Sequence, residues 1–165
     1  MERRYRIILF ALILGSFMTA LDATIVAVAL PTIAHDMGEA GHDTSNISWV
    51  LLIYTLMLCC FILLWSKIGS NIGYKKVFII GITIFTISSL AIGICGLMPE
   101  LGLMSIIILR GVQGLGAGMS MSMSLAMVSS YLPAESRGSC IGAVTLSSSA
   151  GTAFGPAIGG ILTSV

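Results

Sequence analysis

The sequence predicts an all-α integral membrane protein with five membrane-spanning helices. Its 165 residues are 56% hydrophobic and 9% charged, and their mean hydropathy is +1.04. A soluble domain carries about 25% charged residues. Five apolar runs also reach the ~18–20 residues that a helix needs to cross ~30 Å of hydrocarbon. The expected spans are residues 7–30, 47–65, 77–98, 101–131 and 139–165.

The first expected span, residues 7–30, follows a cluster of arginines and contains one acidic residue, Asp22. A cleaved secretory signal is an alternative for this segment, because Ala27-Val28-Ala29 resembles a cleavage site. The apolar run is longer than the ~7–15 residues of a signal peptide's apolar region, and it includes a carboxylate. We therefore expect the segment to remain in the membrane as a span.

The loop after this span carries His35-Asp36, His42-Asp43 and a formal glycosylation sequon at Asn46. A solvated linker is the favoured interpretation and a bound metal ion is the alternative, because nothing in the loop fixes a coordination geometry. The cysteines of the later segments show no metal or redox spacing, so we expect them to pack as small hydrophobes. They are Cys59, Cys60, Cys95 and Cys140.

The basic residues outside the spans all fall on one side of the expected topology: Arg3, Arg4, Arg6, Lys67, Lys75, Lys76 and Arg137. The opposite loops contain acidic residues and no Lys or Arg. Under the positive-inside rule, this asymmetry places the N-terminus in the cytoplasm and, with five spans, the C-terminus outside. The expected setting is the plasma or inner membrane of a cell.

The fourth expected span, residues 101–131, contains a single charge, Arg110. Helical spacing places four residues roughly on its face: Gln113, Gly114, Ala117 and Met121. Such a face suits a helix that borders a watery cavity. At 1.5 Å rise per residue, Asp22 and Arg110 both lie about 12–14 Å below the outer surface. An ion pair between the first and fourth spans is therefore allowed, either as a working part of transport or as a static pin between two helices.

Two further patterns on the fourth span concern packing. Gly114 and Gly118 are expected to let another helix approach closely. Met119, Met123 and Met127 recur at every fourth position and so share one face. This stripe could form an adaptable binding surface, although core packing is its commoner role.

The fifth expected span, residues 139–165, has Gly151, Gly155 and Gly159 at every fourth position. Three bare backbone patches therefore share one helix face, which indicates a tight helix–helix contact. Pro156 and Gly160 beside them predict a kink, and a bend with a role in gating is the further hypothesis.

Several function classes are excluded by composition. The net charge of +1 gives no basic patch for nucleic acid. No histidine lies within a span to activate a serine, and no second intramembrane carboxylate accompanies Asp22. The sequence therefore does not predict an enzyme, and neither a cofactor nor a metal is expected.

Residues 21–31 (LDATIVAVALP), 110–116 (RGVQGLG) and 151–160 (GTAFGPAIGG) lie in order on the first, fourth and fifth expected spans. They resemble the first-span signature, the fourth-span motif and the fifth-span antiporter motif of the fourteen-helix drug:proton antiporters of the major facilitator superfamily. The resemblance covers essentially the whole chain. It implies proton-coupled export of amphipathic small molecules, with Asp22 and Arg110 in proton coupling and Gln113 orienting or hydrating the arginine.

One loop departs from the family pattern. Residues 66–76 read SKIGSNIGYKK, where the family usually has Gly-x-Leu-Ala-Asp-Arg-x-Gly-Arg-Lys. Ser70 stands in place of the acid and Asn71 in place of the arginine of an inward-side charge latch. Three positions of the pattern remain: Gly73, Lys75 and Lys76. Ala27 likewise stands where the first-span signature commonly has Asn.

Length limits what the chain does alone. The superfamily builds each half from six spans and moves substrate between two such halves. Five spans do not complete one half, so the expected partners are the missing helices or another membrane subunit, besides the bilayer, protons and the small-molecule substrate. The alternative function belongs to another class: a non-transporting assembly module that docks through the Gly151/Gly155/Gly159 face.

Overall fold

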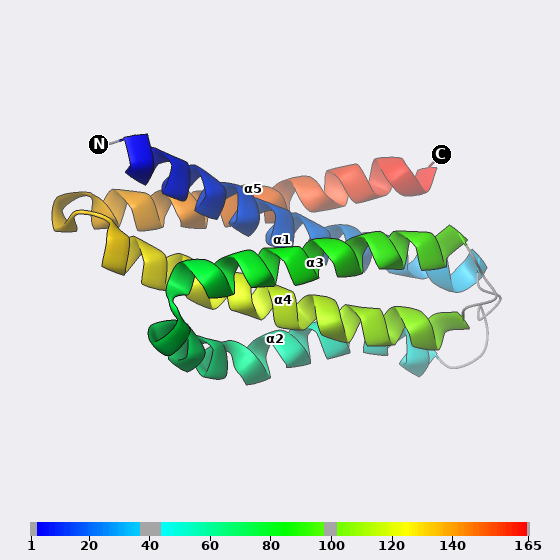
Figure 1. The fold of residues 1–165 in the computed structure, drawn as a ribbon. Helices are drawn as coiled ribbons and strands as arrows, with labels where there is room; N and C mark the ends of the chain where they lie inside the picture. The colour runs from blue at the N-terminus through cyan, green and yellow to red at the C-terminus, as the bar shows by residue number, and fades with distance from the viewer. Residues whose placement is uncertain (1–2, 37–43, 98–101, 165) are drawn as a thin grey trace.

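Five long α-helices make up nearly all of the chain that the computed structural model describes, namely residues 3–36, 44–97 and 102–164 (Figure 1). The helices are α1 (Arg3–Asp36), α2 (Thr44–Ile72), α3 (Tyr74–Leu97), α4 (Gly102–Tyr131) and α5 (Arg137–Ser164), with a short 3-10 turn, η2 (Ala134–Ser136), before α5. Successive helices run in alternating directions, as expected for a chain that crosses a bilayer repeatedly (Figure 1). The all-α membrane fold predicted from the sequence is confirmed.

Four of these helices are long and apolar enough to cross a membrane: Tyr5–Val28, Ser48–Ile72, Tyr74–Gly96 and Leu103–Tyr131. The fifth expected span forms a helix of 28 residues, α5. Its Ser, Thr and Gly residues interrupt the apolar sequence, and α5 is not among the four helices that length and apolarity identify as spans. A membrane crossing by α5 remains a prediction from length and position.

The α2 helix extends beyond the apolar run that predicted it. Residues 66–72 are polar but compatible with a helix, and α2 ends only at Ile72. Gly73 then adopts a φ of +108°, a conformation that side chains with a Cβ rarely adopt. Its N–H donates a hydrogen bond of 2.9 Å to Gly69 O. Gly73 thus ends α2, and α3 begins at the next residue.

The residues around this turn are largely exposed. Lys75 and Lys76 are exposed in the first turn of α3, and Asn71 is exposed at the end of α2. The Ser70 hydroxyl donates 2.7 Å to Lys67 O within its own helix. The expected loop after the first span begins later than predicted, because α1 continues through His35 and Asp36. The side chains of these two residues, of residues 42 and 43, and of Asn46 lie outside the described residues.

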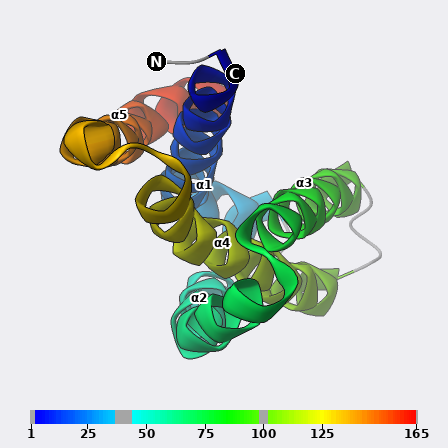
Figure 2. The same ribbon diagram turned by 60° about the vertical axis from the view of Figure 1, so that its left-hand side comes forward.

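The helices are arranged as a pair and a trio. α1 packs along α5, while α4 packs against both α2 and α3, and the pair meets the trio over a much smaller contact (Figure 2). The α1–α5 contact also includes a hydrogen bond of 2.7 Å from the Ser147 hydroxyl to Ile13 O. Asp22 of α1 and Arg110 of α4 belong to the two sides of this smaller contact.

Glycines bring α4 close to its two neighbours. A Cβ placed at Gly114 would lie 2.5 Å from Tyr54 O of α2, and one at Gly116 would lie 2.7 Å from Gly81 O of α3. At Gly118 the corresponding approach to Leu58 O is 3.1 Å. Lipid supplies no hydrophobic drive between helices, so backbone approach of this kind is a main source of packing energy. The expected contacts at Gly114 and Gly118 are present, and both face α2.

The glycine face of α5 packs against α1 of the same chain. A Cβ at Gly151 would lie 2.6 Å from Phe17 O, one at Gly155 would overlap the Thr24 side chain, and one at Gly159 would lie 3.2 Å from the Val28 Cβ. The predicted close contact is therefore present within this chain. Pro156 is exposed and α5 remains helical through it, so the kink at Pro156 and Gly160 stays a prediction.

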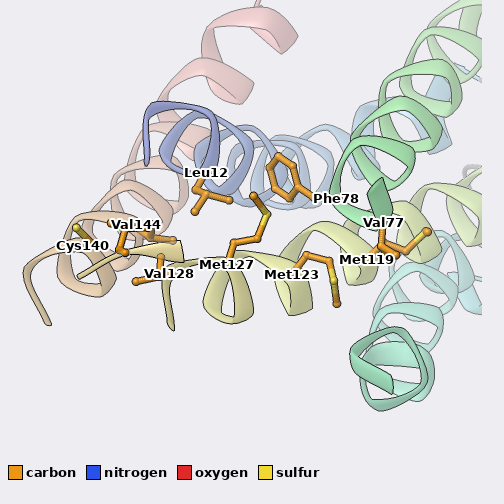
Figure 3. Close-up of a cluster of buried hydrophobic side chains, with 10 residues drawn as sticks. Leu12, Val77, Phe78, Met119, Met123, Met127, Val128, Cys140 and Val144 are labelled. Atoms are coloured by element: carbon orange, nitrogen blue, oxygen red, sulfur yellow. The ribbon is translucent and has the colours of Figure 1, made fainter. Parts of the chain in front are cut away.

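The methionine stripe of α4 is core, not an exposed binding surface. Met119, Met123 and Met127 are buried beside Leu12 and Phe78 (Figure 3). Flexible thioether side chains fill the irregular space where α1, α3 and α4 converge.

The prediction that the cysteines pack inside the protein holds for Cys140, which lies in this same core. It is wrong for Cys59 and Cys60, which are exposed, while Cys95 is partly exposed. The reason is that a uniformly apolar helix carries no pattern to show how it is rotated about its own axis, so the sequence does not specify which face points inward.

Candidate functional site

The two intramembrane charges meet where α1 faces α4. Arg110 Nη1 lies 2.8 Å from Asp22 Oδ2 in an ion pair. The same nitrogen donates 2.7 Å to Gln113 Oε1, and Gln113 Nε2 donates 3.1 Å to the other carboxylate oxygen, Asp22 Oδ1. Arg110 and Gln113 are three residues apart on one helix and therefore share a face. The three side chains form a closed triangle of polar contacts.

This triangle is well shielded from solvent and lipid. The Arg110 side chain is 5% exposed and that of Asp22 is 17% exposed, while Gln113 is fully buried. A charge removed from water costs several kcal/mol, and a partner offsets this cost only with good geometry and further hydrogen bonds. Both carboxylate oxygens have a donor here. The arrangement can therefore hold an ionised Asp22 within the membrane, and protonation of Asp22 would weaken it.

Tyr54 of α2 completes the surroundings of Arg110. The guanidinium carbon lies 5.9 Å from the centroid of the Tyr54 ring, over its face. Arg110 Nε is buried and has no hydrogen-bond partner among the described residues. The sequence reasoning did not identify Tyr54. The sequence feature that relates to Tyr54 is Gly114, one helical turn beyond Arg110. Because glycine has no side chain, the Tyr54 backbone can approach α4 at this position.

A cavity of about 400 Å³ opens beside the triangle. Four helices line it, and α3 contributes none of the described lining residues. The lining comprises Gly15, Ser16, Thr19, Ala20, Ala23 and Thr24 of α1, Tyr54 and Leu58 of α2, Ala117, Ser120, Met121, Ser124 and Leu125 of α4, and Val144, Thr145, Ser148 and Thr152 of α5. Ala23 follows Asp22 directly, so the wall of the cavity adjoins the ion pair.

The cavity wall is mainly apolar, bears several hydroxyl groups and carries no charge among the described residues. Several of its hydroxyls donate to carbonyls of their own helix: Thr19 to Gly15 O at 3.1 Å, Ser120 to Gly116 O at 2.9 Å and Thr152 to Ser148 O at 3.1 Å. These groups are satisfied without a ligand, and their oxygens can still accept a hydrogen bond. Small apolar residues interleave with them. Such a wall suits a molecule with both apolar and polar parts.

Of the remaining predicted residues, some line the cavity and others lie in other parts of the structure. Ala117 and Met121, expected on the face of Arg110, both line the cavity. Gly114 and Gly118 contact α2 instead. The other expected residues lie elsewhere. Gly151, Gly155 and Gly159 are in the α1–α5 contact, Pro156 and Gly160 are further along α5, and Gly73, Lys75 and Lys76 are at the α2–α3 turn.

Comparison with known proteins agrees with this architecture. The profile of the Major Facilitator Superfamily matches residues 12–165. The multidrug resistance protein Stp of Mycobacterium tuberculosis is 38% identical over 163 residues, covering 98% of this chain and 29% of that protein. The riboflavin transporter RibZ of Clostridioides difficile is 34% identical over 156 residues, covering 94% of this chain and 32% of that protein.

A third relative, the tetracenomycin C resistance and export protein of Streptomyces glaucescens, is 32% identical over 154 residues, covering 93% of this chain and 27% of that protein. The chain thus spans between about a quarter and a third of the length of these curated relatives. The profile match nevertheless extends over almost all of it. The chain therefore belongs to the Major Facilitator Superfamily, a family of multi-pass membrane transporters rather than enzymes.

Proposed function

We propose that the protein carrying this chain exports amphipathic small molecules in exchange for protons, with Asp22 and Arg110 coupling the two movements. The observation that supports this most directly is the buried Asp22–Arg110–Gln113 triangle at the edge of an uncharged, hydroxyl-bearing cavity. Two of the relatives are named for multidrug resistance and for resistance and export of tetracenomycin C.

The coupling step follows from the contacts of Asp22. Its ionised form ties α1 to α4 through the 2.8 Å ion pair and the 3.1 Å hydrogen bond from Gln113. Protonation removes the charge and weakens both contacts, at a place where the pair and the trio of helices touch over a small area. A substrate that binds more tightly to one protonation state than to the other then shifts the equilibrium between them.

Gln113 has an orienting role in this scheme. Its amide accepts from Arg110 and donates to Asp22, so it fixes both groups at once. It is fully buried, and an amide that lost either contact in the membrane interior would leave a polar group unsatisfied. Gln113 thus favours the paired arrangement whenever Asp22 is ionised.

The proposed topology places the N-terminus in the cytoplasm of a cell, in its plasma or inner membrane, because the basic residues outside the spans lie on one side. Proteins of this architecture bind substrate between two halves, whereas this chain covers about a third or less of its relatives. The proposed partners are therefore the missing helices or another membrane subunit, together with the bilayer, protons and substrate.

The alternative, an assembly module that docks through the glycine face of α5, gains no support from the structure. That face is already covered by α1, with Gly151, Gly155 and Gly159 each against a residue of that helix. A second chain would have to displace α1 to use it.

Export by the complete transporter tests the proposal. Asp22→Asn and Arg110→Ala should each abolish proton-driven export while membrane insertion stays normal, because either change removes one partner of the coupling pair. Glu135→Gln is the matched control, since Glu135 is an exposed carboxylate outside the long helices.

The double variant Asp22→Asn with Arg110→Gln separates coupling from a static pin. Removing both charges leaves neither one buried and unpaired, so a pin would regain its structure and its function. Proton-dependent export recovered in this double variant would overturn the coupling role, and continued loss of export with normal surface expression supports it.

A further inference from the structure

Arg110 uses one nitrogen for both of its strong polar contacts. Nη1 carries the 2.8 Å ion pair with Asp22 and the 2.7 Å hydrogen bond to Gln113. Nε is buried without a partner among the residues described. The guanidinium carbon lies over the Tyr54 ring, 5.9 Å from its centroid. Part of the guanidinium therefore contacts an aromatic face and not an oxygen acceptor.

The Tyr54 ring is held mainly by the trio of helices: it packs in a cluster with Phe85 of α3 and Ala117 of α4, to which α1 adds Ala23. Tyr54 is 7% exposed, and its backbone lies directly against Gly114 of α4, where a Cβ would come within 2.5 Å of the Tyr54 carbonyl oxygen. Gly114 lies one helical turn beyond Arg110 on the same helix. The Gly114 contact therefore fixes the Tyr54 backbone, and Phe85 and Ala117 pack beside its side chain, whatever the protonation state of Asp22, which belongs to α1.

This independence matters when Asp22 becomes neutral. Arg110 then loses its carboxylate partner, and a cation in a desolvated site tends to move towards water. Gln113 Oε1 and the Tyr54 ring remain, both on the α2–α4 side of the site. The attraction of a guanidinium to an aromatic face is greatest where water is excluded. The Tyr54 ring thus provides an attractive interaction with Arg110 that protonation of Asp22 does not remove.

We propose that Tyr54 is a positioning residue, which keeps Arg110 in place while Asp22 is protonated so that the ion pair can re-form. This inference rests on the proposed coupling function and adds a residue to it. The ring face carries the role, and the phenolic hydroxyl does not. Phenylalanine should therefore replace Tyr54, whereas an aliphatic residue should not.

The test measures how well Arg110 is held when Asp22 is neutral. Membranes from cells expressing the chain are treated with phenylglyoxal, an arginine-selective reagent, and modification of Arg110 is quantified by mass spectrometry of its peptide. Arg137, which is exposed, serves as the internal reference in every sample. Asp22→Asn stands in for the protonated carboxyl group.

In the Asp22→Asn background, Arg110 should react slowly both with Tyr54 retained and with Tyr54→Phe. Tyr54→Leu in that background should raise the rate about tenfold, which corresponds to about 1.4 kcal/mol. With Asp22 intact, the ion pair should protect Arg110 in all three cases. Equal rates for Tyr54→Leu and Tyr54→Phe in the Asp22→Asn background would overturn the proposal.

A shape-matched variant separates the charge–ring attraction from simple packing. Trifluorophenylalanine incorporated at position 54 keeps the ring but withdraws charge from its face, so the rate should fall between those of Tyr54→Phe and Tyr54→Leu. A rate equal to that of Tyr54→Phe would show packing alone and refute the inference. Export is not measured here, so a failure of this test and a failure of the coupling proposal are distinguishable.

Discussion

Gly151 offers a sharp test of the α1–α5 contact. An alanine Cβ at this position would lie 2.6 Å from Phe17 O and 3.1 Å from Leu21 N. Both atoms belong to the backbone, so no side-chain rotation can relieve the overlap. The helices would have to separate by roughly 0.5–1 Å, and such a gap forfeits a quarter to a half of each dispersion contact along the interface.

Gly151→Ala should therefore lower the free energy of unfolding by about 1–3 kcal/mol, the usual range for overpacking. Gly142 on the same helix is the matched control, because it is exposed and a Cβ there would meet nothing within 4 Å. Gly142→Ala should raise the free energy of unfolding by about 0.5–1 kcal/mol, since alanine favours a helix over glycine.

Thermal unfolding of both variants in one detergent, followed by the fluorescence of Trp49 and Trp65, measures this difference. A change of 1 kcal/mol shifts the melting temperature of a chain of this size by roughly 2–4 °C. Gly151→Ala should accordingly melt about 3–16 °C below Gly142→Ala. Equal melting temperatures, or a higher one for Gly151→Ala, would refute the assignment of the α5 glycine face to a close contact with α1.

Three further predictions concern topology, the α2–α3 turn and the core. In a cysteine-free background, a cysteine in the Glu39–Asp43 loop should react with an impermeant thiol reagent from outside and one beside Lys75 should not; the reverse labelling pattern would invert the proposed orientation. Gly73→Ala should lower the melting temperature by a few degrees, because its φ of +108° costs a residue with a Cβ about 1–2 kcal/mol; an unchanged melting temperature would contradict this. Met123→Ala should destabilise the protein by about 2–5 kcal/mol because Met123 is fully buried, whereas Met121→Ala, at an exposed cavity-lining position, should leave melting nearly unchanged. Equal melting of these two variants would argue against the core assignment.

Much of the architecture follows from the sequence because the bilayer imposes a common length and apolarity on every span. The helices α3, α4 and α5 begin and end near the expected limits, whereas α1 and α2 extend beyond theirs. The meeting of Asp22 and Arg110 could also be anticipated. Two lone charges at matched depth in apolar spans are costly apart and less costly together, and the structure joins them at 2.8 Å.

The sequence could not determine how each helix is rotated about its own axis. The spans are apolar around their whole circumference, so no period separates an inner face from an outer one. For this reason the placement of Cys59 on the surface and of Met123 in the core became known only from the structure. The sequence also did not show which helix packs against the α5 glycine face. Small residues permit close approach, but their pattern does not identify the neighbouring helix.

Tyr54 shows the same limit at the candidate site. Its sequence neighbours are mostly apolar residues of an ordinary span, and its place beside Arg110 arises from a backbone contact with Gly114 sixty residues along the chain. The sequence by itself determined that this is a membrane protein and which two intramembrane charges could pair. Only the tertiary structure decided what surrounds these charges, because their surroundings depend on which faces of nearly uniform apolar helices come together. Lipid provides no hydrophobic drive between helices, so small residues and close packing determine which faces meet.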